Sequence, residues 1–153
     1  MTLDVDKYQE GRTALFHASL EGKDDIVQIL LDAGADISIC STKDGDTPLI
    51  IACSEGHSKV AQKLILAGAQ VNGPNRGGWT PLIYAAYYDH KEVVQLLLSH
   101  NADINQTSNV SNFVFKIVCL RCVLLTCLLL QTGCSALYRA STSNKPAMAR
   151  LLI

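Results

Sequence analysis

Two kinds of apolar segment alternate along the chain. The first kind is short and rich in small residues, as in "LIIACSE" from Leu49 and "LIYAAYY" from Leu82. The second kind carries apolar residues at helical spacing, as at Val60, Leu64 and Ile65. Side chains three or four positions apart share one face of an α-helix. The pattern therefore predicts pairs of helices, in which a short helix with small residues precedes an amphipathic one.

Polar and small residues mark where these helices begin and end. A threonine precedes alanine or proline at the start of each first helix, at Thr13, Thr47 and Thr80. A threonine side chain caps the first turn of a helix, and proline fits the first helical position. Residues that accept a left-handed backbone follow each helix. These are Gly22, Gly56 and Asp89 after the first helices, and Gly34, Gly68 and Asn101 after the second helices.

The whole pattern occurs three times, starting at Gly11, Gly45 and Gly78. The threonines that begin the three units follow one another at spacings of 34 and then 33 positions. The one extra residue falls in the loop between Ser38 and Gly45. No such unit can bury its apolar face alone, so we expect the stability of the array to come from stacking of neighbouring units.

A period of 33 with T-P-L near its start resembles the ankyrin repeat. The resemblance implies an all-α, ankyrin-like helical-repeat solenoid with short β-turn loops, which acts as a protein-protein interaction module. The chain departs from the family in one respect. The histidine that usually follows T-P-L is replaced by Phe16, Ile50 and Ile83. The hydrogen bonds that this histidine makes in relatives are therefore not expected here.

The repeat pattern divides the chain into six parts. Residues 1–10 look like the end of a preceding repeat, residues 11–44, 45–77 and 78–109 are three full repeats, residues 110–131 are an apolar insert, and residues 132–153 are a truncated fourth repeat. Terminal repeats normally carry polar outer faces, and neither end shows such a capping repeat. We therefore expect the chain to be a piece of a longer array.

The insert interrupts an otherwise regular period. Ser135 takes the place of the threonine in a fourth unit, but it follows Thr80 by 55 positions. Removal of the segment 110–131 would restore a period of 33. We interpret the insert as an intron retained in frame, since Val-Ser can be encoded by a splice donor and Leu-Leu-Leu-Gln by an acceptor. An uninterrupted exon without a shorter transcript would contradict this interpretation.

Three other interpretations of the insert remain open. Residues 113–130 are long and apolar enough to approach a membrane span, but Lys116 and Arg121 would each cost roughly 2.5 to 3.5 kcal/mol at a helix centre. Cys119-x-x-Cys122 could be half of a zinc site, although no second pair of suitable spacing follows. The segment could also be an extra apolar helix that packs on the third repeat.

Composition and motifs argue against several classes of function. Lys plus Arg number 13 and Asp plus Glu 14, so the chain lacks the basic excess typical of nucleic-acid binding. Six cysteines without a secretory signal suit reduced thiols in a cytoplasmic protein. We find no phosphate-binding loop, H-E-x-x-H or G-x-S-x-G motif. We therefore predict no enzyme activity, no catalytic residue, no cofactor and no metal. Structural hydrogen bonds are expected for His17, His57, His90 and His100.

The resemblance implies that a partner meets the turns before each T-P-L and the exposed ends of the first helices. By position these residues are Arg12, Leu20, Glu21, Lys43, Asp44, Asp46, Ser54, Glu55, Arg76, Gly77, Trp79, Tyr87 and Tyr88. We expect the last three rings and Arg76 to form one rim that anchors the partner, because Trp, Tyr and Arg are enriched at binding hot spots.

The sequence leaves two alternative interpretations of this site open, and two of the function. One tyrosine could pack under the next unit, and Trp79 could shield the loop that contains Pro74; Tyr84 is expected to pack in the core between units. The partner is another protein of unknown identity. The chain could instead be a membrane-associated ankyrin fragment tethered through residues 113–130, or an accessory segment of a larger enzyme.

Overall fold

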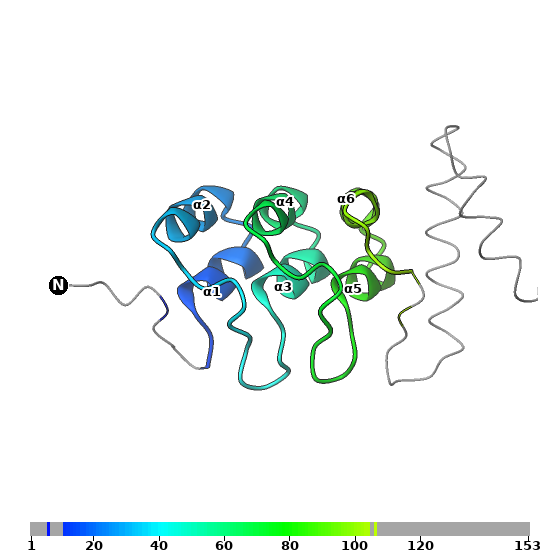
Figure 1. Cartoon of the computed structure of the whole chain (residues 1–153), viewed down its shortest axis with the longest axis horizontal. Coiled ribbons are helices and arrows are strands. Elements are labelled where there is room, and N and C mark those ends of the chain that lie inside the picture. The colour runs from blue at the N-terminus through cyan, green and yellow to red at the C-terminus, as the bar shows by residue number, and fades with distance from the viewer. Residues whose placement is uncertain (1–5, 7–10, 105, 107–153) are drawn as a thin grey trace, which may run out of the picture. The chain divides into compact units, whose positions relative to one another are not determined.

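A computed structural model of the protein describes residue 6, residues 11–104 and residue 106. Six α-helices lie in this part of the chain (Figure 1). They are α1 (Ala14–Leu20), α2 (Asp24–Asp32), α3 (Pro48–Ser54), α4 (Ser58–Leu66), α5 (Pro81–Tyr87) and α6 (Lys91–Ser99). All six belong to one compact unit.

The six helices form two rows, as expected for stacked helix pairs. The seven-residue helices α1, α3 and α5 lie side by side in an inner row, and the nine-residue helices α2, α4 and α6 form an outer row (Figure 1). Each inner helix packs on the outer helix that follows it. The all-α repeat architecture predicted from the sequence is therefore confirmed.

The three threonines begin the inner helices as predicted. The hydroxyl oxygens of Thr13, Thr47 and Thr80 accept hydrogen bonds from the backbone N–H three residues ahead, at 3.2, 3.2 and 3.3 Å. Pro48 and Pro81 occupy the first helical positions of α3 and α5. A proline costs nothing there, because the N–H that it lacks would have no helical acceptor.

The backbone turns left-handed after each helix, which confirms the second set of sequence signals. The angle φ is +68° at Gly22 and +77° at Gly56, and it is +59° at Asp89, which takes the same place in the third repeat. Asn101 likewise replaces glycine after α6, with φ of +61°. The turns at Gly22, Gly56 and Asp89 bring each outer helix back along its inner partner.

The core runs through all three repeats. Phe16, Ile50 and Ile83, which stand where the family has histidine, are buried apolar side chains. Complete burial of a side chain of this size contributes roughly 1.5 to 3 kcal/mol relative to leaving it in water. In the three described repeats, hydrophobic burial thus takes the place of a polar network at this position.

Long loops project from the side of the inner row that faces away from the outer helices (Figure 1). Backbone hydrogen bonds join each loop to the one before it. The N–H of Thr42 donates to the carbonyl oxygen of Gly11, and the N–H of Arg76 donates to that of Asp44, both at 3.1 Å. The loops before α3 and α5 are therefore held next to their predecessors.

Several sequence predictions fall outside the described residues. They concern the apolar insert 110–131, its membrane-span and Cys119-x-x-Cys122 interpretations, and the truncated repeat 132–153. In the part of the chain that is described, none of the helices has the length and apolar character that a membrane crossing requires.

Candidate functional site

Asn75 organises the loop that leads into α5. Its side-chain oxygen accepts hydrogen bonds from the N–H groups of Gly77 and Trp79, at 3.0 and 2.9 Å. Its side-chain nitrogen donates to Asp46 Oδ1 at 2.7 Å and to the hydroxyl oxygen of Tyr84 at 3.2 Å. One amide therefore joins the loops before α3 and α5 to the inner helix. Sequence reasoning missed Asn75, although asparagine in a turn was a usable signal, because its side chain mimics a backbone turn.

Four aromatic rings form one continuous cluster around this loop. The ring of Trp79 lies 4.9 Å from that of Tyr84 and meets that of Tyr87 edge-on at 5.6 Å between centroids. The ring of Tyr88 meets Tyr87 edge-on at 5.0 Å and is parallel to Tyr84 at 6.5 Å. We call Trp79, Tyr84, Tyr87 and Tyr88 the aromatic rim. Trp79, Tyr87 and Tyr88 thus lie in one cluster.

The rings of the aromatic rim differ in exposure. Tyr87 and Tyr88 are 53% and 52% exposed, so about half of each side chain is in solvent. Trp79 and Tyr84 are partly buried, and Trp79 lies close to Gly77. The prediction that Tyr84 packs in the core is wrong. Its hydroxyl accepts a hydrogen bond from Asn75 and its ring packs on Trp79, which keeps it at the edge of the inner row.

Arg76 bonds to the loop that precedes its own. Its guanidinium donates to the carbonyl oxygens of Thr42 and Lys43 in the preceding loop. A side chain that bridges two loops in this way holds their relative position. The sequence analysis placed Arg76 on one rim with the rings, whereas in the structure it supports the loop from which Trp79 extends.

Asp46 is the partly buried acid of the site. Its main chain is held by Ser41, whose N–H donates to the Asp46 carbonyl oxygen at 2.8 Å. Burial raises the pKa of the Asp46 carboxyl above its ordinary value, and the neighbouring charge of Asp44 adds to this effect. The hydrogen bond from Asn75 and the positive charge of Arg12 oppose it. The guanidinium of Arg12 also lies over the ring of Phe16, 5.0 Å from its centroid.

The remaining predicted residues lie at the ends of the inner helices or at a loop tip. Glu21 and Glu55 are exposed caps after α1 and α3, and Lys43 and Asp44 are exposed in the loop before α3. Leu20 and Ser54 contribute their carbonyl oxygens to bonds with the next repeat. Along the array, the positions of Leu20 and Glu21 correspond to Tyr87 and Tyr88 in the third repeat, so only there are they aromatic.

Comparison with known families agrees with this geometry. Residues 34–108 match a family model of ankyrin repeats in three copies, and residues 10–42 match a model of a single ankyrin repeat. The chain belongs to the ankyrin repeat family. No curated protein matches the chain. Ankyrin repeat domains generally bind proteins, and neither match is to a family of enzymes.

The described part of this ankyrin repeat chain offers little for catalysis or metal binding. Burial raises the pKa of the Cys53 thiol far above its ordinary value, so this sulfur is not a nucleophile at neutral pH. Within residues 11–104, no group of three or more His, Cys, Asp or Glu side chains is arranged to hold a metal ion. What these ankyrin repeats do present is an ordered set of partly exposed aromatic rings.

Proposed function

We propose that this ankyrin repeat chain is a protein-binding scaffold or adaptor that holds its partner on the aromatic rim of the third repeat. The observation that carries the proposal is the exposure of Tyr87 and Tyr88, each about half in solvent, beside Trp79. Rings of this size that stay exposed do not gain the free energy of burial. A partner that covers them would supply it. Tyrosine and tryptophan are also enriched among the residues that dominate binding energies.

The rim is ordered before any partner arrives. Trp79 is fixed by the hydrogen bond from its N–H to Asn75 and by edge-on contact with Tyr87. Tyr87 and Tyr88 end the rigid helix α5 and contact each other edge-on. A surface whose rotamers are already restricted loses less entropy on binding, so more of the contact energy contributes to affinity.

The other predicted residues form the periphery of the same site. They are Arg12, Leu20, Glu21, Lys43, Asp44, Asp46, Ser54, Glu55 and Arg76. Because most of these are charged and solvated, we propose that they set orientation and association rate more than affinity. Arg76 contributes through the loop that it holds. We further propose a cytoplasmic location, which suits the free thiols of Cys40 and Cys53, and no catalytic role.

The proposal is tested by binding measurements on the full chain. Partners are captured on the immobilised chain from extracts of its source cells, identified by mass spectrometry, purified, and titrated by calorimetry. We expect Tyr87→Ala, Tyr88→Ala and Trp79→Ala each to weaken the dissociation constant by about 30-fold or more, corresponding to the loss of roughly 2 kcal/mol at a central residue.

Leu66→Ala is the matched control, because Leu66 is an exposed apolar residue on α4, in the other row of helices. This variant should bind with unchanged affinity. Melting temperatures of all four variants are measured in parallel. Full retention of binding in the three ring variants would refute the proposal. It would also fail if every ring variant that loses binding has also lost its fold.

A further inference from the structure

Two sets of equivalent positions carry charges and rings at the candidate site. The residues just before the three capping threonines are Arg12, Asp46 and Trp79. The residues that follow the three inner helices are Glu21, Glu55 and Tyr88. In both sets an acid in the second repeat is followed by an aromatic ring in the third. Because α3 packs on α5, negative charge and aromatic rings meet at this junction.

Asp46 lies beside the aromatic rim and has a neutral hydrogen-bond donor. Asn75 Nδ2 donates both to Asp46 Oδ1, at 2.7 Å, and to the hydroxyl oxygen of Tyr84, at 3.2 Å. The carboxylate and the ring therefore share one amide. Among the described residues, no lysine or arginine nitrogen lies within 4.0 Å of an Asp46 carboxylate oxygen.

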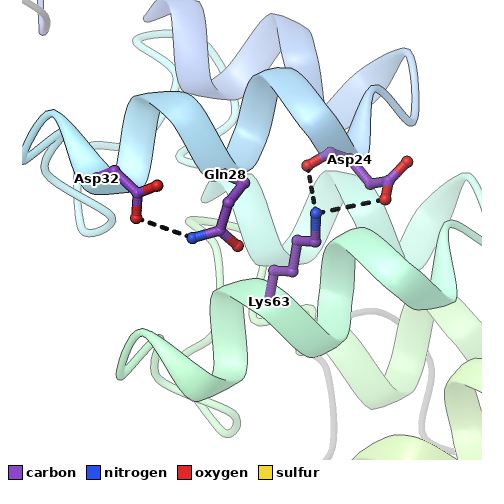
Figure 2. Close-up of polar contacts among 4 residues, drawn as sticks. All are labelled: Asp24, Gln28, Asp32 and Lys63. Atoms are coloured by element: carbon purple, nitrogen blue, oxygen red, sulfur yellow. Dashed lines mark hydrogen bonds and ion pairs between the residues drawn. The ribbon is translucent and has the colours of Figure 1, made fainter.

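Two acids of α2 show how the chain holds carboxylates elsewhere. Lys63 places its Nζ 3.3 Å from Asp24 Oδ2 and donates to the Asp24 carbonyl oxygen at 2.7 Å (Figure 2). In the same view Gln28, a neutral donor, bonds to Asp32 at 2.9 Å. Asp32 is exposed, so water screens its charge. One acid therefore has a cation, and the other has a neutral donor together with solvent.

Asp46 differs from both, because it combines a neutral donor with partial burial. Burial raises the pKa of its carboxyl, and the charge of Asp44 adds to this effect. Burial also raises the pKa of Tyr84, as do the charges of Asp46 and Asp44. Two acids therefore make the field at the Tyr84 hydroxyl more negative. A cation placed beside this ring would be attracted by both.

Two arginines close to these loops already have other partners. Arg76 donates to the carbonyl oxygens of Thr42 and Lys43. Arg12 lies with its guanidinium over the ring of Phe16, 5.0 Å from the centroid. This second contact shows that a guanidinium can lie over a ring of an inner helix. It also leaves the rings of the third repeat to a cation from outside the chain.

The rings of the third repeat have the orientation and the exposure that such a cation needs. Tyr84 and Tyr88 are parallel to within 7°, so their faces point in one direction. About half of Tyr88 is in solvent. The face of an aromatic ring carries partial negative charge and attracts cations. A guanidinium stacks on such a face better than an ammonium group, because it is planar and more weakly hydrated.

Building on the proposed function of the aromatic rim, we propose that the rim binds an arginine side chain of the partner, with the guanidinium against the rings of Tyr84 and Tyr88 and its charge beside Asp46. A guanidinium can stack on a ring through its face while its N–H groups donate to a carboxylate. The partner is therefore a protein with an exposed, arginine-containing segment. Unlike the solvated acids at the periphery, Asp46 contributes to affinity, because it is partly buried.

The test titrates the full chain with two synthetic peptides of glycine and serine. One contains three spaced arginines, and the other contains citrulline, a neutral side chain of the same shape, at the same places. Trp79 is the single tryptophan of the chain, so its emission reports occupancy of the rim. We expect saturable binding of the arginine peptide, and binding of the citrulline peptide that is weaker by about fivefold or more.

Asp46→Asn should weaken binding of the arginine peptide by about fivefold or more, because the charge is lost while the oxygen that accepts from Asn75 is kept. Tyr88→Ala should have an effect of similar size. Asp25→Asn is the matched control, because it removes the same charge from an exposed residue of α2, in the other row of helices. This variant should bind the peptide as the parent chain does.

Three outcomes would overturn the proposal: no saturable binding at millimolar peptide, equal affinity for the two peptides, or equal effects of Asp46→Asn and Asp25→Asn. The partner captured on the chain separates this failure from failure of the proposed function. A partner that needs Tyr88 but binds Asp46→Asn as well as the parent, at low and at high salt, still occupies the rim and refutes the arginine anchor. A partner that is indifferent to all the rings refutes both.

Discussion

The Nε2 atom of His57 lies 3.0 Å from the carbonyl oxygen of Leu20, in the repeat before its own. His90 makes the same contact with Ser54 at 2.8 Å, so the bond recurs at each junction between described repeats. Each imidazole crosses the turn between two helices and satisfies a carbonyl at the end of an inner helix. The structural role predicted for these histidines is confirmed, and His100 likewise bonds within its own helix end, to Leu96 at 2.9 Å.

The position of the His57 ring makes Gly22 a sensitive site. A Cβ atom at Gly22 would lie 2.6 Å from the ring, and φ there is +68°. Gly34 is a matched control, because its φ is +82° but a Cβ atom would meet nothing within 4 Å. Gly34→Ala should therefore show the backbone cost alone, about 1 to 2 kcal/mol of unfolding free energy. Gly22→Ala should cost at least about 1 kcal/mol more, as measured by urea unfolding.

A second background isolates the clash. In a His57→Ala chain the ring is gone, so Gly22→Ala should cost no more than Gly34→Ala does in the same chain. If the excess cost of Gly22→Ala persists without the imidazole, the steric explanation is wrong and the turn itself is responsible.

Asn75→Ala should disrupt the third repeat more than a single lost hydrogen bond would. The side chain makes hydrogen bonds to four partners. Its removal leaves Asp46 Oδ1 and the N–H groups of Gly77 and Trp79 without the bonds that they form with Asn75. We expect a loss of roughly 2 to 3 kcal/mol in unfolding free energy. Trp79 is the single tryptophan of the chain, so its fluorescence should shift at the same time.

Ser41→Ala provides the comparison for Asn75→Ala. Ser41 stands at the equivalent place in the preceding loop, where its hydroxyl accepts one hydrogen bond, from the N–H of Asp46 at 3.2 Å. Loss of this hydrogen bond should lower the free energy of unfolding by about 1 kcal/mol and leave the tryptophan emission unchanged. Equal costs for the two variants, without a change in emission, would show that Asn75 does not organise the aromatic rim.

Asp46→Asn should raise the free energy of unfolding above that of the natural chain, and this gain should be larger at neutral pH than at low pH. Burial raises the pKa of Asp46 in the folded state, so its protonated form is the one that folding favours. Its contribution to stability is complete below the unfolded pKa and is lost as the pH rises through the folded pKa. Asparagine keeps the oxygen that accepts from Asn75 but carries no charge.

The two chains are compared by urea unfolding between pH 3 and pH 7. The stability of Asp46→Asn relative to the natural chain should rise from the ordinary aspartate pKa of 3.8 upward and then level off. A difference that falls with rising pH would mean that the carboxylate is stabilised in the folded chain, through Arg12 and Asn75, more than burial disfavours it.

The local elements of this chain could be predicted because their causes are local. Thr47 caps a helix whose first residue follows it directly, and Gly56 occupies a left-handed turn within the same repeat. Grouping of Trp79 with Tyr87 was predictable for a related reason, since both belong to one turn and the helix that it begins. Interactions within a few residues depend on backbone geometry that the sequence pattern already specifies.

Contacts between repeats were harder to predict from the sequence. The bond from Asn75 to Asp46 joins residues 29 positions apart, and that from Arg76 to Thr42 joins residues 34 apart. Nothing in the residue types shows that Arg76 would turn toward a neighbouring loop and not toward the rings. The orientation depends on how closely two loops are stacked, which is a property of the assembled array.

The sequence by itself determined the repeat period, the helix pairs and the apolar face of each outer helix. It could not distinguish Ile26 from Val60, because both are β-branched apolar residues at the same place in the pattern. Only the tertiary structure decided that Val60 is buried and that half of Ile26 faces solvent. Periodicity specifies which face of a helix is apolar, but burial requires a neighbouring surface to cover that face, and in a stacked array the neighbour is another repeat.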